Sequence, residues 1–165
     1  MKILITGSKG QLASELQLEL AGAGKLLALG HNALDLSDSD QVREQVRLLR
    51  PDLIINAAAY TAVDRAEDEP GAAFRANADA PGRLARTCAR IGARLVHYST
   101  DYVFDGQGQR PRREDDACAP LGVYGKSKRA GEEAILATDC EAWVFRTAWV
   151  YGVRGQNFLR TMLRL

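Results

Sequence analysis

The sequence predicts an α/β domain in which a parallel sheet is covered by helices on both faces. Short apolar runs alternate with longer segments of helical periodicity, a pattern typical of successive β-α-β units. The first apolar run leads directly into a glycine-containing turn. A chain of 165 residues is long enough to enclose a core, so we expect one domain over residues 1–165.

The first three elements follow from local patterning. Residues 2–6 (KILIT) are an apolar run of the length of a buried strand. Residues 11–22 place leucines four positions apart, on one face of a helix. Residues 25–29 (KLLAL) are apolar again, and we expect the second strand there.

The same alternation continues through the chain. Ser37 or Asp38 can cap a helix that ends at Pro51. The following helical sequence, over 64–91, is interrupted at Pro70 and closed by Gly92. The remaining expected elements are strands over 53–56, 94–99 and 142–147, a loop over 105–120, a helix from Val123 to Thr138, and a helix over 157–165.

Composition excludes several classes of function. The net charge is +1, so the basic excess that non-specific nucleic-acid binding needs is missing. No apolar stretch approaches the ~20 residues of a membrane span, and the N-terminal apolar run is too short for a signal peptide. Cys88, Cys118 and Cys140 form no CxxC pair, which fits free thiols in a reducing compartment. We expect a cytoplasmic protein with no nucleic-acid or membrane partner.

The turn after the first strand reads GSKGQLA over residues 7–13. Dinucleotide-binding folds use such a turn between strand and helix. Gly7 permits the tight turn, Gly10 lets the backbone approach a pyrophosphate, and the small Ala13 lets helix and strand pack closely. Free N–H groups at the helix N-terminus would then face the phosphates. The alternative is an ordinary tight turn with no ligand.

The end of the second strand bears on which dinucleotide would bind. NAD-binding folds carry an acidic residue there for the ribose 2′-hydroxyl, but this strand ends Leu-Gly-His-Asn. With no carboxylate to repel a 2′-phosphate, and with Lys9 and His31 expected nearby, NADPH is favoured, while NADH stays open. Asp35 and Leu36 could reach the adenine edge; otherwise Asp35 is an ordinary polar residue before a helix.

Two further patterns concern the chemistry. The small residues 56–59 (NAAA) at the end of the third strand leave room for a ligand or for close packing. Tyr124 and Lys128 are four apart on a predicted helix and so share one face. An ammonium beside the phenol would lower the pKa of Tyr124 and suit it to donate a proton. Thr100, at the end of the fourth strand, would bring a hydroxyl to the same place.

Together these motifs resemble the extended short-chain dehydrogenase/reductases. Four segments more narrowly resemble the dTDP-4-dehydrorhamnose reductases: 56–64 (NAAAYTAVD), 97–105 (HYSTDYVFD), 120–128 (PLGVYGKSK) and 145–151 (FRTAWVY). The resemblance covers the whole chain. It implies a Rossmann-like doubly wound fold and NADPH-dependent reduction of the 4-keto group of dTDP-6-deoxy-L-lyxo-4-hexulose to dTDP-L-rhamnose.

The resemblance also implies roles for individual residues. Tyr124, Lys128 and Thr100 would be the catalytic group, while Thr100, Asp101 and Trp149 would contact the substrate. Asn77 would support the site, with helix capping as the alternative, and Trp149 could instead be a core aromatic. The residues expected to contact the cofactor are Gly7, Gly10, Gln11, Leu12, Asp35, Leu36, Ala58, Ala59, Thr61, Tyr98, Tyr124 and Lys128.

Other implications concern what lies beyond this chain. The family's C-terminal substrate-binding part is absent, so we expect a truncated reductase that alone binds NADPH weakly and turns over little substrate. Some relatives hold Mg²⁺ at a dimer interface; Glu15 is the one candidate ligand, and a solvated helix carboxylate is the alternative. A homodimer is expected only for a longer protein.

Two other readings stay open. A sugar-nucleotide epimerase or dehydratase shares the glycine turn and the YxxxK pair, although a dehydratase would want an acidic pair where Asp101 is followed by Tyr102. A non-catalytic regulatory relative is the second; such proteins tend to lose the tyrosine or the lysine, and both are present here.

Overall fold

A computed structural model describes all residues 1–165 and contains one five-stranded sheet. The strand order is β2-β1-β3-β4-β5, and every neighbouring pair is parallel. The predicted α/β class and parallel sheet are therefore confirmed. The strands are β1 (Lys2–Thr6), β2 (Lys25–Leu29), β3 (Leu53–Asn56), β4 (Arg94–Thr100) and β5 (Ala142–Thr147).

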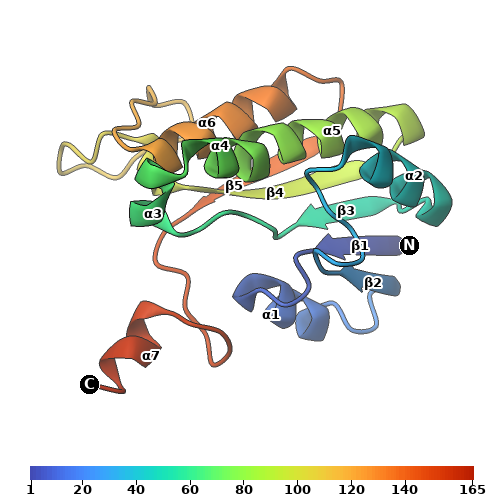
Figure 1. Ribbon diagram of the computed structural model, residues 1–165, viewed down its shortest axis with the longest axis horizontal. Helices are drawn as coiled ribbons and strands as arrows, with labels where there is room; N and C mark the ends of the chain where they lie inside the picture. Colours follow the sequence, from blue (N-terminus) through green and yellow to red (C-terminus); the bar gives the residue numbers. More distant parts are fainter.

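The helices cover the two faces of the sheet unequally. In Figure 1, α1 lies alone on one face, α2 to α6 lie on the other, and α7 projects away from the sheet at the C-terminal end. None of these helices has both the length and the apolar character needed to cross a bilayer. The helices are α1 (Gln11–Glu19), α2 (Ser39–Leu49), α3 (Val63–Asp68), α4 (Pro70–Phe74), α5 (Ala80–Ile91), α6 (Val123–Leu136) and α7 (Phe158–Met162), with a π-helical turn at Arg75–Asp79 and a 3₁₀ turn at Asp101–Val103.

Several helices differ from the predicted ones. Helix α1 ends at Glu19, three residues early, because Gly22 and Gly24 adopt positive φ and return the chain to β2. The interruption expected at Pro70 is confirmed between α3 and α4, but the π-helical turn between α4 and α5 was not predicted. Helix α7 has only five residues. Of the two proposed caps for α2, Asp38 is the one used, since its carboxylate accepts the backbone N–H groups of Asp40 and Gln41.

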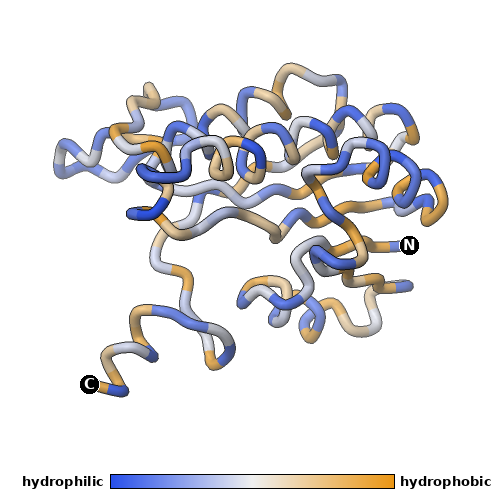
Figure 2. The backbone as a smooth tube through the Cα atoms, in the orientation of Figure 1, coloured by the Kyte–Doolittle hydropathy of each residue, from blue (hydrophilic) through white to orange (hydrophobic).

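The core has one large and one small cluster, on opposite faces of the sheet. Eleven buried residues lie between the sheet and α2, α5 and α6, and four pack under α1. Figure 2 shows hydrophobic colour concentrated along the strands. On the α1 face, Trp143 and Phe145 of β5 remain half exposed, so α1 covers only part of that face.

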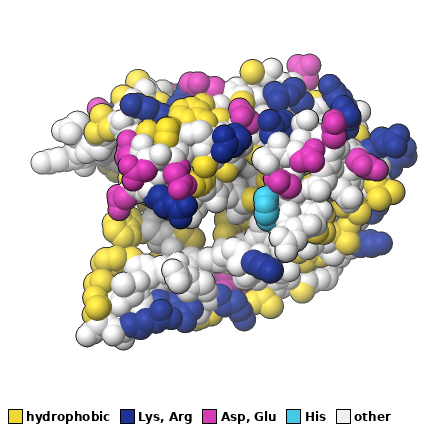
Figure 3. Space-filling view, viewed as in Figure 1, with side chains coloured by type: hydrophobic (Ala, Val, Ile, Leu, Met, Phe, Trp, Pro, Cys, Tyr) yellow, Lys and Arg dark blue, Asp and Glu magenta, His cyan; other side chains and the backbone are white.

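The carboxyl ends of all five strands lie at one edge of the sheet because the strands are parallel. After β1 the chain adds β2 on one side of β1, and then crosses to add β3 on the other side. The boundary between β1 and β3 is therefore a topological switch point. Open α/β sheets bind ligands outside the carboxyl ends of the strands at such a point. Figure 3 shows the molecule hollowed between the segment carrying α7 and the helical layer.

Candidate active site

In the glycine turn after β1, the backbone at Gly7 lies close to the backbone at Ala58. Gly7 has a φ of 71°, and a Cβ there would lie 2.9 Å from Cα of Ala58. Gly10 caps α1 and donates its N–H to the Gly7 carbonyl at 2.8 Å. Ala13 is fully buried against β1 and β3, so the small residue is needed for packing. The turn thus brings the α1 N-terminus to the switch point.

Gly7→Ala is expected to destabilise the protein more than Gly22→Ala. Both positions have positive φ, but nothing lies within 4 Å of a Cβ at Gly22. The control should therefore cost only the left-handed strain of about 1–2 kcal/mol. Gly7→Ala adds a backbone clash at the turn, so it should also abolish dinucleotide binding. Thermal unfolding and NADPH fluorescence measure the two effects; equal losses in both variants would contradict this account.

Most residues predicted to form the site line one cleft of about 580 Å³ at the carboxyl edge of the sheet. The cleft runs from the glycine turn, past the ends of β3 and β4, to α6 and the segment after β5. The predicted residues that line it are Gly10, Gln11, Leu12, Ala59, Thr61, Tyr98, Thr100, Asp101, Tyr124, Lys128 and Trp149. The sequence thus brings residues up to 139 positions apart to one surface.

The other predicted cofactor residues line a second cleft of about 330 Å³: Gly7, Asp35, Leu36, Ala58 and again Ala59. His31 and Arg75 also line it, whereas Lys9 lines the first cleft. Lys9 and His31 thus line different clefts, and their expected place beside a 2′-phosphate stays a prediction. Hydrogen bonds from the Ser37 hydroxyl and backbone lower the pKa of Asp35, so this cleft holds a carboxylate beside two basic side chains.

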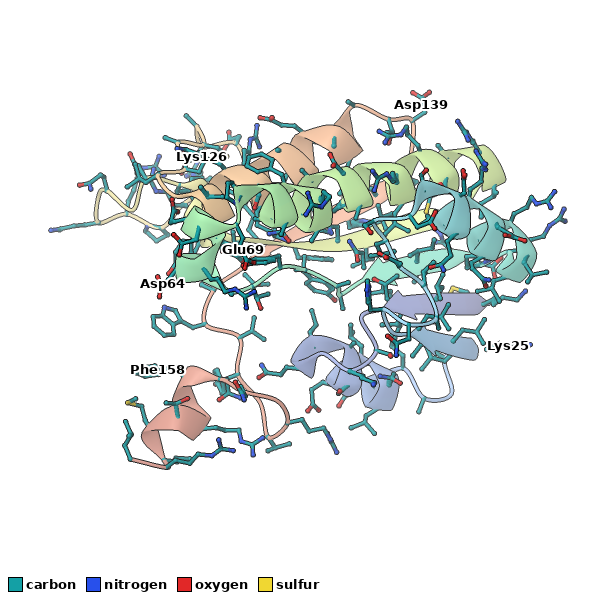
Figure 4. The ribbon with its side chains drawn as sticks, in the orientation of Figure 1. Lys25, Asp64, Glu69, Lys126, Asp139 and Phe158 are labelled. Atoms are coloured by element: carbon teal, nitrogen blue, oxygen red, sulfur yellow. The ribbon has the colours of Figure 1, made fainter.

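Tyr124 and Lys128 of α6 both line the first cleft. Lys126, between them, is exposed and points outward (Figure 4). Lys128 is only 2% exposed. Its Nζ donates to the Tyr98 carbonyl at 2.5 Å and lies 3.5 Å from His97 Nε2. Burial lowers the pKa of Lys128 to about 8, against the opposing effect of Glu132. Lys128 is therefore easier to deprotonate than an exposed lysine, although it is still mostly an ammonium at neutral pH.

The pKa of Tyr124 differs from its sequence-based expectation. Burial raises it, and a hydrogen bond with Thr100 only partly opposes this. Lys128 does not lower it here, because its ammonium is turned toward the Tyr98 carbonyl. The phenol is therefore held protonated at neutral pH, the state that a proton donor needs.

Asn77 joins the two sides of the site rather than capping a helix. It is fully buried in the π-helical turn. Its amide accepts from the Tyr60 N–H at 2.9 Å and donates to the Tyr60 carbonyl and to the Ser127 hydroxyl. Ser127 lies between Tyr124 and Lys128 on α6, so Asn77 fixes this helix against the loop after β3.

Two of the three expected substrate residues, Asp101 and Trp149, are exposed at the cleft, whereas Thr100 is buried. Asp101 is exposed, and its carboxylate accepts the Thr100 hydroxyl at 3.2 Å. Trp149 is 72% exposed, with a φ of 52°, so it is not a core aromatic. It packs edge-on against Phe158 of α7, which Figure 4 shows apart from the sheet.

Glu15 is paired with an arginine and belongs to no cluster of potential metal ligands within this chain. Its carboxylate pairs with Arg154 at 3.1 Å, and residues 1–165 contain no cluster of three potential metal ligands. The magnesium candidate therefore finds no support here.

Three features of the site were missed in the sequence. Arg75 lines the second cleft, and Tyr102 packs edge-on against Tyr124 with ring centroids 5.6 Å apart. Glu132 is buried one turn after Lys128 and accepts from Arg129 and Arg146. The i, i+4 spacing from Lys128 places Glu132 on the inner face of α6, and this was the available signal.

The fold and the site together define a dinucleotide-binding domain of the short-chain dehydrogenase/reductase class. Residues 1–165 match the sequence model of the family described as "RmlD substrate binding domain". The chain belongs to this family.

Individual relatives agree with this placement. The chain is 50% identical to the dTDP-4-dehydrorhamnose reductase of Salmonella typhimurium, with all of the chain and 56% of the relative aligned. A crystal structure of such a reductase from Clostridium acetobutylicum matches 99% of the chain with a TM-score of 0.96 at 40% identity, over 59% of its own length. The crystal structure of the Bacillus anthracis reductase, in complex with NADP, matches with a TM-score of 0.96 at 39% identity, and the match covers 58% of its length. The chain spans little more than half the length of these relatives.

Proposed function

We propose that residues 1–165 are the nicotinamide dinucleotide-binding domain of a dTDP-4-dehydrorhamnose reductase. The observation that carries this proposal is the joining of Tyr124, Lys128 and Thr100 to the glycine turn by one continuous cleft. The relatives' printed name, dTDP-4-dehydrorhamnose reductase, supports this proposal. We propose dTDP-4-dehydro-6-deoxy-L-mannose as the substrate and dTDP-L-rhamnose as the product.

The residues present fit a dinucleotide. The space that a Cβ would fill at Gly7 is taken by the Ala58 backbone, and the Gly10 turn presents the N-terminus of α1. When bound, the reduced nicotinamide supplies a hydride to the carbonyl carbon. Gly10, Gln11 and Leu12 would hold the phosphates, and the second cleft, with Asp35 and Leu36, would hold the adenosine end.

The chain's own residues supply the proton. Tyr124, held as a neutral phenol, donates its proton to the substrate 4-oxygen as the carbon accepts hydride, so a ketone becomes an alcohol. Thr100 would hydrogen-bond the phenol, and Lys128 would orient the nicotinamide ribose. Asp101 and Trp149, on the open side, would contact the sugar.

The test is NADPH oxidation by the complete gene product with the dTDP-linked 4-keto sugar. Substrate-dependent oxidation that yields dTDP-L-rhamnose supports the proposal. Conversion of a dTDP-hexose without net NADPH consumption would point to an epimerase or dehydratase, and cofactor binding without turnover of any sugar nucleotide to a regulatory relative.

The proposal includes NADPH as the preferred cofactor, with Arg75 near its 2′-phosphate. Arg75→Gln should weaken NADPH binding about tenfold, the effect of losing one charge-assisted hydrogen bond, and change NADH binding little. Fluorescence titration with both cofactors measures this. Arg86→Gln is the matched control, since Arg86 is exposed on α5 and lines neither cleft. Equal weakening of both cofactors by Arg75→Gln would contradict the assignment.

We also propose a cytoplasmic location, because Cys88, Cys118 and Cys140 are all free thiols. A homodimer of a longer protein stays a prediction.

A further inference from the structure

A row of buried polar side chains crosses the sheet and ends at Lys128. Thr6, Asn56 and His97 are register partners on the adjacent strands β1, β3 and β4, and each is 1% exposed. Lys128 reaches the end of the row from α6. Polar groups buried this deeply cost free energy unless each has a hydrogen-bond partner, so the direction of every bond in the row is constrained.

The direction is set at Asn56. Its Oδ1 lies 3.3 Å from the Ala58 backbone nitrogen and 2.6 Å from the Thr6 hydroxyl. A backbone N–H can only donate, so the amide oxygen of Asn56 must face it, and the amide nitrogen must face the other way. Asn56 Nδ2 then donates to His97 Nδ1, 3.1 Å away.

This bond fixes the tautomer of His97. A nitrogen that accepts a hydrogen bond carries no proton, and a neutral imidazole has its one proton on the other nitrogen. Burial, and secondarily the charge of Lys128, lower the pKa of His97 to about 3, so the ring is neutral at pH 7. The proton of His97 is therefore on Nε2, which lies 3.5 Å from Lys128 Nζ.

Among the groups around Lys128, the charge of Glu132 opposes this second donor, because it raises the pKa of Lys128. The Tyr98 carbonyl of β4 accepts one ammonium proton. Glu132 lies one turn further along α6, but Arg129 and Arg146 already pair with its carboxylate. Tyr124 is a neutral phenol, and Asn77 of the π-helical turn bonds Ser127 instead.

We propose that His97 is a positioning residue, which Asn56 holds with its Nε2–H directed at Lys128 so that the neutral amine of Lys128 is favoured. When Lys128 is an ammonium, its N–H groups face the Nε2–H of His97, and two donors oppose each other. When Lys128 has released one proton to solvent, the lone pair of its neutral amine accepts the Nε2–H. The inference rests on the proposed function only in taking Lys128 as part of the active site.

The tautomer is measured by long-range ¹H–¹⁵N NMR of the complete gene product labelled in histidine. The His97 signals are assigned by their loss in His97→Phe or, if that variant does not fold, by coupling to the backbone. The expected result is a protonated Nε2 and an unprotonated Nδ1 at pH 7. A proton on Nδ1, or on both nitrogens, overturns the proposal.

The effect on Lys128 is measured by the pH titration of its ε-carbon signal without substrate. His97→Phe keeps the ring volume and the burial but removes the donor, so the pKa of Lys128 should rise by about one unit, the effect of one hydrogen bond to a single protonation state. An unchanged or lower pKa would overturn the proposal. In the control Thr6→Val, the Ala58 N–H still orients Asn56, and the titration should not move. Neither NMR measurement needs turnover. Failure of this proposal can therefore be told apart from failure of the proposed reductase function.

Discussion

Tyr124→Phe is expected to lower kcat in the complete gene product by roughly 10²–10⁴-fold, the usual contribution of a positioned acid. The phenol is the proton donor at the end of the cleft, and phenylalanine keeps its ring packing against Tyr102. Binding of NADPH should change little, because the phosphates and the adenosine end contact other elements. Initial rates of NADPH oxidation and fluorescence titration separate the two effects.

The matched control is Tyr151→Phe. Tyr151 is 71% exposed and does not line the cleft, so removing its hydroxyl should leave turnover unchanged. If Tyr124→Phe retained more than about a tenth of the rate, another group would have to donate the proton. The role given to Tyr124 would then be wrong.

The second large effect is expected at Glu132, and it concerns stability. Glu132 is 2% exposed and receives hydrogen bonds from Arg129 and from two nitrogens of Arg146. Glu132→Gln leaves both guanidinium groups without their buried counter-charge. Removing one partner of a fully buried pair costs about 3–5 kcal/mol. Because both arginines are partly exposed, we expect about 2 kcal/mol, or roughly 6 °C in Tm.

Glu133→Gln is the control for this variant. Its carboxylate is 59% exposed and pairs with the same Arg129 at the surface, so the loss should stay below about 0.5 kcal/mol. Chemical denaturation of the three proteins gives the comparison. Equal stabilities of Glu132→Gln and Glu133→Gln would contradict the importance of the buried pair.

The pH dependence of the Glu132 effect has a definite sign. Burial raises the pKa of Glu132, but hydrogen bonds from Arg146 and Arg129 outweigh it, and the net pKa is lowered. A carboxyl with a lowered pKa in the folded state stabilises above its unfolded pKa, and the stabilisation is lost as the pH falls through the folded value. The difference between wild type and Glu132→Gln should therefore shrink in acid.

The parts of the fold that were predictable from sequence depend on local pattern. The strands are short apolar runs between helical segments, and β1, β2, β3 and β5 have the predicted bounds. Gly7 and Gly10 were recognisable because only a residue without a side chain fits such a turn. The spacing of Tyr124 and Lys128 predicted a shared helix face.

What the sequence could not provide depends on contacts between distant segments. The direction of the Lys128 ammonium is decided by the Tyr98 carbonyl and by His97, thirty or so positions away. The π-helical turn within the segment 64–91 packs closely against α6, where a Cβ on Gly131 would lie 2.0 Å from the Asn77 carbonyl oxygen. No periodicity in either segment alone reveals such contacts.

The most direct test of the central claim is a crystal structure of the complete gene product with NADP⁺. The account predicts the pyrophosphate at the Gly10 turn, the nicotinamide in the cleft beside Tyr124, and Lys128 within reach of its ribose. A dinucleotide bound elsewhere, or one whose nicotinamide lies away from Tyr124 and Lys128, would contradict it.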